Sequence, residues 1–297
     1  MQTLYTLHAA QGSITAADAE KILQKHLDQS RQLFVYLIYF LTEVARYAEK
    51  DARLRGSKHL PTKEDLAVNI KIAGNEILWR ILEDESFKKA VAECRPSLID
   101  NGELVKKFYV QLAETPEYKA YIGEPSRDKK SEKEILEFIF STLLLPSESF
   151  ISHLEENFIH WDDDAEMMNQ LVLNFLQKPG GNDFKEMISQ EKWKFAKDLL
   201  RTVEEKREFT LNMIKPRLKN WDADRIAQLD MILMQMGVCE FLFFETIPTK
   251  VTINEYIDLA KEYSTPQSGQ FVNGILDNIH KDLQSQDKLH KVSFKKN

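Results

Sequence analysis

Apolar residues recur at intervals of three and four positions along almost the whole chain, and no strand-like alternation repeats at regular spacing. An interval of this kind is that of one face of an α-helix. Glycine and proline are few, 10 and 9 in 297 residues, so we expect long helices separated by few turns. The pattern predicts an all-α fold.

Capping residues and helix breakers divide this pattern into segments. The first eight residues resemble the end of a helix, and a second, long helix with N-cap candidates at 13–18 is expected to run to a stop at Gly56. Thr62 predicts the cap of a third helix, and a capping box at 131–134 predicts a later one that Pro146 breaks. Further helices are predicted at 87–94, 102–114, 117–122, 149–159, 162–176, 186–215, 223–245, 251–263 and 267–283.

Loop-forming residues suggest where the chain divides. The segment 123–130, Gly-Glu-Pro-Ser-Arg-Asp-Lys-Lys, has the strongest loop composition and is the best candidate for an internal boundary. The polar and locally basic composition of 285–297 predicts a flexible basic tail.

Composition limits the class of protein. The net charge of −7 argues against a uniformly basic nucleic-acid binder, although a local basic face would act independently of the total because charges are screened over about 10 Å. Cys94 and Cys239 are far apart and predict free thiols, which suits a reducing cytosol, so we expect a cytoplasmic protein. The apolar run 33–41 is too short to span a bilayer and predicts a core helix.

Catalytic and metal-binding patterns are weak. The sequence has no Gly-rich phosphate loop, no Ser or Cys nucleophile signature and no His-Glu-x-x-His. The run His160-Trp-Asp-Asp-Asp164 could suggest a metal site, but carboxylates at a helix start more often cap free N–H groups. We therefore predict a protein that is not an enzyme and has no cofactor and no metal.

The last third of the chain carries a more specific pattern. Its central segment, 247–263, reads Ile-Pro-Thr-Lys-Val-Thr-Ile-Asn-Glu-Tyr-Ile-Asp-Leu-Ala-Lys-Glu-Tyr, and Phe-Val-Asn-Gly-Ile-Leu-Asp follows at 271–277. Together with 195–203, 214–218, Trp221, 225–233 and 240–242, these segments resemble the C-terminal half of the NusB family of transcription antitermination factors. Gln2-Thr-Leu-Tyr5 resembles the end of that family's first helix. The resemblance implies an all-helical bundle, NusB-like over 184–284, and an N-terminal region over 1–183 that contains additional helices inserted after the first.

The resemblance also implies an RNA-binding surface that includes six residues. Tyr5 matches a tyrosine whose ring could stack on an unpaired base, but it could equally be a core aromatic. Phe271 and Tyr263 flank a loop where the family's aromatic side chains meet RNA, although periodicity places Phe271 in a core stripe. Within the helix, Gly274 is expected to permit close helix approach. The six residues are Gln2, Tyr5, Tyr263, Gln270, Phe271 and Asn273.

Partner binding is implied for two further positions. Glu240 matches a glutamate on the family's surface for the ribosomal protein NusE, and we expect an exposed carboxylate there that would orient a basic partner. Gln235 lies about one and a half turns earlier. The family's Arg-rich arm, which precedes the Gln-x-Leu-Tyr motif, is expected to be missing here, and Gln270 stands where a basic residue is common.

The leading hypothesis is an RNA-binding transcription antitermination or termination factor. It would bind a single-stranded leader element of ribosomal RNA transcripts together with NusE and so act on the RNA polymerase elongation complex indirectly, with no membrane involved. The alternative is a NusB-fold scaffold for protein interactions that binds RNA weakly or not at all. The NusB-like domain of an RNA cytosine methyltransferase is disfavoured because no catalytic domain follows Leu283.

Overall fold

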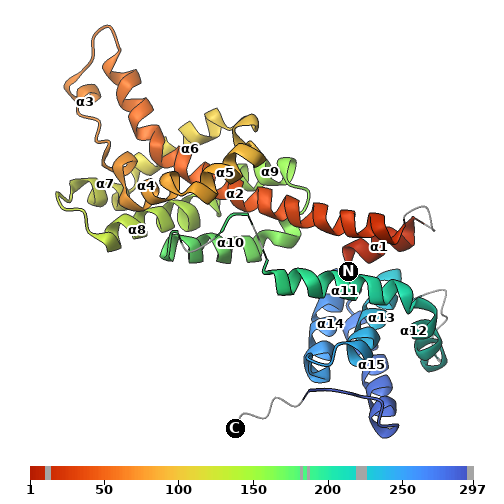
Figure 1. Ribbon diagram of the computed structural model, residues 1–297. Coiled ribbons are helices and arrows are strands. Elements are labelled where there is room, and N and C mark those ends of the chain that lie inside the picture. The colour runs from red at the N-terminus through yellow and green to blue at the C-terminus, as the bar shows by residue number, and fades with distance from the viewer. Residues whose placement is uncertain (11–14, 181–182, 186–187, 219–225, 293–297) are drawn as a thin grey trace. The chain divides into compact units, whose positions relative to one another are not determined.

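The computed structural model describes residues 1–10, 15–180, 183–185, 188–218 and 226–292, and every regular element in these ranges is helical. The predicted all-α fold is therefore confirmed. The chain forms two compact units, and each is described by itself (Figure 1). Unit 1 comprises Met1–Lys25 with Ile188–Asn297, and unit 2 comprises His26–Met187.

Unit 1 is built around one helix that is buried on nearly all sides. This helix, α13, carries a continuous buried stretch from Ile232 to Phe241, as expected for a helix that is apolar around its whole circumference. Leu4 and Leu7 of α1 join the same core as Leu199 and Leu200 of α11. The helices of unit 1 are α1 (Gln2–Ala9), α11 (Gln190–Glu205), α12 (Arg207–Ile214), a 3₁₀ turn η4 (Lys215–Arg217), α13 (Gln228–Phe243), α14 (Thr249–Tyr263) and α15 (Ser268–Ser285).

A close helix approach in unit 1 occurs at Gly237, and not at Gly274. A Cβ added at Gly237 would lie 2.9 Å from Leu276 Cδ2 and 3.3 Å from Tyr256 Cδ2, so the absence of a side chain lets α14 and α15 pack directly on α13. A Cβ added at Gly274 would meet nothing within 4 Å. The expectation that Gly274 permits close helix approach is wrong, because this position faces outward on α15.

Unit 2 is also built around a buried helix. The first ten residues of α2 belong to unit 1, and the part from His26 onward belongs to unit 2, where residues 33–38 are all buried. Figure 1 shows the other helices of this unit gathered along that part of α2. Unit 2 contains the remainder of α2 (Ala16–Gly56), α3 (Lys63–Leu66), η1 (Lys71–Gly74), α4 (Glu76–Glu83), α5 (Glu85–Cys94), η2 (Pro96–Leu98), α6 (Gly102–Glu114), α7 (Pro116–Gly123), α8 (Lys129–Phe138), a π-helical segment η3 (Ile139–Leu144), α9 (Glu148–Asn157) and α10 (Trp161–Gln177).

Local signals fixed several helix ends correctly. The long second helix ends at Gly56, Thr62 caps α3, and the predicted helix at 102–114 has those bounds. Two predictions were wrong. Asp128 caps α8 instead of a capping box at Ser131, and the helix predicted over 186–215 is divided at Lys206 into α11 and α12.

The loop-rich segment at 123–130 does not separate two domains, because both of its flanks lie in unit 2. Lys71 Nζ donates to the carbonyl oxygens of Tyr121, Glu124 and Ser126, and Arg127 Nη1 donates to Gly74 O at 2.5 Å. These contacts hold the segment against η1. The divisions of the structure lie instead after Lys25 and after Met187, so the first 25 residues group with the C-terminal bundle.

Part of the predicted pattern lies outside the described residues, namely Trp221 and Arg225 of the family pattern and the start of the helix predicted at 223. No single helix in the described part of the chain is long and apolar enough to cross a membrane, and one bent pair, α8–η3 with α9, would qualify only by length and composition. Within the same ranges, no three His, Cys, Asp or Glu side chains are grouped to hold a metal ion.

Candidate nucleic-acid interface

Four of the six predicted RNA-binding residues lie at one corner of unit 1, where α14 ends and α15 begins. Tyr263 is the last residue of α14, and Gln270, Phe271 and Asn273 lie in the first two turns of α15. The Gln270 and Asn273 side chains are exposed, as expected for positions three apart on the outer face of a helix. Tyr263 and Phe271 are half-buried, and Phe271 packs partly against the core. The corner therefore offers two exposed amides flanked by two aromatic rings.

A small polar network fixes the turn that shapes this corner. Ser268 Oγ accepts from the Thr265 amide at 3.2 Å and donates to Asp230 Oδ2, on α13, at 2.7 Å. Ser264 lies 3.0 Å from the same hydroxyl. Because Ser268 and Asp230 are both buried, the start of α15 is held to the start of α13.

Sequence reasoning did not identify Ser268 and Asp230. The available signal was their position, since each is a small polar or acidic residue in the first turn of a helix, where free N–H groups favour such side chains.

The other two predicted residues lie on α1. The Tyr5 side chain is 47% exposed, whereas its neighbour Leu4 and the later Leu7 are buried in the unit 1 core. α1 packs against α13, the helix that also holds the α15 turn through Asp230. Gln2 is exposed. Tyr5 thus presents its ring on the outer side of a helix whose inner side is anchored in the core.

The two predicted partner-binding residues are interior. Glu240 is 7% exposed and Gln235 is 1% exposed, so the expectation of an exposed carboxylate at 240 is wrong. The cause is the position of both residues on α13, which is surrounded by other helices. Gln235 Nε2 donates to Thr210 Oγ1 and to Arg207 O on α12, both at 3.3 Å.

Glu240 connects α13 to α14. Its carboxylate accepts hydrogen bonds from Tyr256 OH at 2.6 Å and from Thr252 Oγ1 at 2.8 Å. Burial raises the pKa of Glu240, and the hydrogen bonds from Tyr256 and Thr252 oppose that rise only in part. The same carboxylate and burial raise the pKa of Tyr256 well above its usual value.

The C-terminal segment returns to the end of the same helix. Lys291 Nζ donates to Glu240 O at 2.7 Å and to Phe244 O at 2.8 Å, which adds a second hydrogen bond to two carbonyl groups at the end of α13 that also accept from backbone amides. The Val292 amide donates to Glu245 O at 3.0 Å. Burial lowers the pKa of Lys291. The part of the predicted basic tail that the structure describes is thus docked at Lys291 and Val292.

Comparisons with known proteins agree with the geometry of unit 1. A family model described as "NusB family" matches residues 158–281, a range that also includes α10 of unit 2. The transcription antitermination protein NusB of Salinibacter ruber is 41% identical over 133 residues, covering 44% of this chain and 76% of that protein. The protein of the same name from Finegoldia magna is 42% identical over 94 residues, covering 32% of this chain and 69% of that protein.

The match to these relatives is confined to part of the chain. The transcription antitermination protein NusB of Chloroherpeton thalassium is 46% identical over only 72 residues, or 24% of this chain and 34% of that protein. No solved structure matches the chain. The family pattern, the all-helical unit 1 and a relative matched over three-quarters of its length show that this chain belongs to the NusB family.

Proposed function

We propose that this protein is an RNA-binding transcription antitermination or termination factor. It acts on the single-stranded leader of ribosomal RNA transcripts together with the NusE ribosomal protein, and through them on the RNA polymerase elongation complex. The observation that carries the proposal is the rigid corner of unit 1, where exposed amides and half-buried rings meet on a turn fixed by Ser268 and Asp230. Membership of the NusB family supports it.

The chemistry of the corner suits unpaired bases better than a duplex. Single-stranded RNA is recognised through bases that stack on aromatic side chains and present their edges to hydrogen-bonding groups. Tyr263 and Phe271 supply rings at the corner, Tyr5 of α1 supplies a third ring, and Gln270 and Asn273 supply amides that both donate and accept. None of these five side chains is a cation, so they contribute stacking and hydrogen bonds but no phosphate contacts. Binding there should therefore depend less steeply on salt than that of a basic RNA-binding protein.

The partner role of Glu240 and Gln235 is proposed to be indirect. Both side chains are buried and tie α13 to α14 and α12, so they set the positions of the helices and not the outer contacts. Exposed side chains at the adjoining helix ends, Phe243 of α13 and Val251 of α14, are placed to meet the partner. An apolar contact of this kind is typical of the centre of a protein interface.

The test is a titration of the full chain with the leader RNA and with a scrambled RNA of equal composition, with and without NusE. We expect preferential binding of the leader, strengthened by NusE. Tyr5→Ala should weaken leader binding roughly tenfold, because one stacking contact is lost, while Tyr5→Phe should retain it. Equal affinity for leader and scrambled RNA in the presence of NusE would contradict the proposal.

A scaffold that binds proteins and not RNA is the second candidate. It is favoured by the lack of cationic side chains among the six predicted RNA-binding residues and by the overall charge of −7. In the same titration, this function would show NusE binding with no RNA dependence. Phe243→Ala should then weaken NusE binding while Tyr5→Ala leaves it unchanged.

A further inference from the structure

Unit 2 contains a cavity of about 310 Å³ that lies between α4 and α8, beside the end of α10. Four cations line it: Arg80 from α4, and Lys129, Lys130 and Lys133 from the first two turns of α8. These cations are a local concentration in an acidic region. Residues 26–187 carry 21 lysines and arginines against 29 aspartates and glutamates, and the stretch 134–177 contains no lysine or arginine.

The cations of this cavity are poorly neutralised. Within the described part of the chain, the side chains of Arg80 and Lys129 have no ion-pair or hydrogen-bond partner. Lys133 Nζ donates to the neutral Gln177 Oε1 at 2.7 Å, and Lys130 lies 3.7 Å from Glu134 in a pair that is largely exposed to solvent. Exposed pairs of this kind are weak. Apart from the buried Glu132, the cavity lining has one carboxylate, that of Glu76, so its four cations leave a net positive charge for an anionic ligand.

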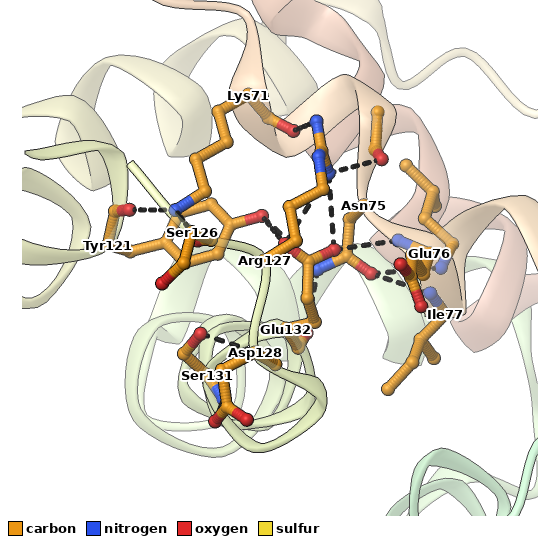
Figure 2. A network of polar contacts seen from close by, with 12 residues as sticks. Lys71, Asn75, Glu76, Ile77, Tyr121, Ser126, Arg127, Asp128, Ser131 and Glu132 are labelled. Carbon is orange, nitrogen blue, oxygen red and sulfur yellow. Dashed lines mark hydrogen bonds and ion pairs between the residues drawn. The ribbon is translucent and has the colours of Figure 1, made fainter. Parts of the chain in front are cut away.

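The carboxylate of Glu132, which also borders the cavity, is already engaged (Figure 2). Glu132 is fully buried and accepts from the Glu76 amide at 2.7 Å and from Tyr121 OH at 2.9 Å. Arg127 lies 3.4 Å from both of its carboxylate oxygens. Its charge is therefore balanced inside the unit and does not cancel the lysines of the cavity.

The same network holds the two cation-bearing helices at a fixed separation. Glu132 belongs to α8 and bonds the first amide of α4, while Asn75 Nδ2 donates back to Glu132 O at 2.7 Å. Asn75 and Asp128 cap α4 and α8 with their own side chains. The N–H groups at the starts of α4 and α8 are thus already hydrogen-bonded to their caps. The contacts between the two helices fix the positions of the charged side chains that line the cavity.

An exposed aromatic ring lies beside the cavity. Trp79 is 49% exposed, and it and Arg80 follow Glu76 by three and four positions on the exposed side of α4. Within the described residues its ring stacks on no other aromatic ring or cation, and it does not line the cavity itself. A small anion would occupy the cavity and leave Trp79 unused, whereas a polymer with both phosphates and bases would engage both.

We infer that the cavity between α4 and α8, together with Trp79, is a second binding site for single-stranded RNA. The inference rests on the proposed function, which brings the protein to a nascent transcript. Proteins that bind single strands combine cations for the backbone with aromatic rings on which bases stack, largely without regard to sequence. The site would hold RNA that flanks the leader element, with phosphates at Arg80 and the three lysines and a base on Trp79.

The test uses the full chain and two RNAs, the leader element alone and the same element extended at either end by an unstructured single strand. The first variant, Arg80→Gln with Lys129→Gln, removes the two cations that have no partner and so loses no native contact. The second is Trp79→Ala, with Trp79→Phe as the variant that retains a ring. Lys88→Gln with Lys106→Gln is the matched control, because it removes two unit 2 surface cations outside the cavity lining.

We expect the double cavity variant to bind the extended RNA roughly tenfold more weakly and to lower the slope of log affinity against log salt by about 1.4, as for two lost phosphate contacts. Trp79→Ala should also weaken it roughly tenfold, with Trp79→Phe close to the native protein. Binding of the short element and the thermal unfolding midpoint should not change. The control should match the native protein on both RNAs.

The outcomes separate the two proposals. If the native protein prefers the leader and the cavity variants bind extended RNA as the native protein does, the second site is refuted and the proposed function stands. If the native protein shows no leader preference but the cavity variants weaken its RNA binding, the proposed function fails and the second site stands. If the native protein binds neither RNA, both are refuted.

Discussion

Units 1 and 2 each enclose a buried central helix, but they use buried polar groups differently. In unit 1 the polar groups lie on the central helix itself, where Asp230, Gln235 and Glu240 tie α13 to α15, α12 and α14. In unit 2 the central stretch 33–48 of α2 is mainly apolar and aromatic, and the principal buried carboxylate, Glu132, lies on the outer helix α8. Directional bonds therefore position the neighbours of α13, whereas close packing contributes more around α2, alongside hydrogen bonds such as that between Tyr36 and His153 of α9.

Removal of one aromatic ring from each central helix should give the largest effects. Phe40 in α2 and Phe241 in α13 are fully buried, and Phe40 contacts the rings of Phe108 and Phe150. Phe40→Ala and Phe241→Ala should each lower the free energy of unfolding of their own unit by about 3–5 kcal/mol. Amide hydrogen exchange should accelerate mainly within the mutated unit. Equal acceleration in both units would show that they unfold as one and would remove the basis of the comparison.

The apolar pattern predicted most helices because helix formation depends on local spacing and capping. Burial of polar residues on α13 was harder to predict, since Glu240 on an isolated amphipathic helix would be exposed. A signal was present nonetheless: α13 is apolar around its whole circumference, so any polar residue within it must be interior. The attachment of segment 123–130 could not be predicted, because Lys71 and Arg127 reach carbonyl groups about fifty residues away in the sequence.

Removal of a buried carboxylate should lower the stability of either unit, whether the carboxylate lies on the central helix, as Glu240 does, or on an outer helix, as Glu132 does. Glu240→Ala leaves the buried hydroxyls of Tyr256 and Thr252 without an acceptor, and should lower the free energy of unfolding by about 2–3 kcal/mol. Glu132→Ala should lower the free energy of unfolding by a similar amount, since it leaves the Glu76 amide and Tyr121 OH without a hydrogen-bond acceptor. The exposed Glu134→Ala is the control and should change stability by less than about 0.5 kcal/mol. Chemical denaturation measures all three.

Under the partner proposal, Glu240 and Glu132 differ in their importance for NusE binding. Glu240→Ala should also weaken NusE binding, because α13 and α14 lose the bond that sets their separation. Glu132→Ala should leave NusE binding unchanged. If both variants reduce NusE binding in proportion to their loss of stability, Glu240 has no positional role beyond stability.

Two glycines allow a smaller test of packing in unit 1. Gly237→Ala places a methyl group 2.9 Å from Leu276 Cδ2 in a filled core, and should destabilise by about 1–3 kcal/mol. Gly274→Ala faces open space on an exposed helix position and should stabilise by about 0.5–1 kcal/mol through helix propensity. Thermal unfolding of the two variants should shift in opposite directions. A destabilising Gly274→Ala would mean that this face of α15 is covered.

Acidification should change the stability contribution of one buried group in each unit, with opposite signs for His153 of unit 2 and Glu240 of unit 1. In unit 2, burial lowers the pKa of His153, whose Nε2 is hydrogen-bonded to Tyr36 OH at 2.5 Å. The unfolded chain then binds a proton more readily, so unit 2 loses stability as the pH falls below the ordinary histidine value of 6.5. In unit 1, burial raises the pKa of Glu240 above 4.5, so the folded form binds a proton more readily, and the contribution of this group to stability is present at low pH and is lost as the pH rises through the folded pKa.

These two windows can be assigned with variants that keep size and hydrogen-bonding capacity. His153→Gln should flatten the loss in unit 2 below pH 6.5, and Glu240→Gln should flatten the pH dependence of unit 1 above pH 4.5, each followed by hydrogen exchange of amides in its own unit. Glu156 and Asp100 raise the pKa of His153 and so oppose the effect of burial on that pKa. The pH-dependent change in the stability of unit 2 is therefore the smallest effect predicted. If His153→Gln leaves the acid profile of unit 2 unchanged, other titrating groups of that unit account for the profile instead.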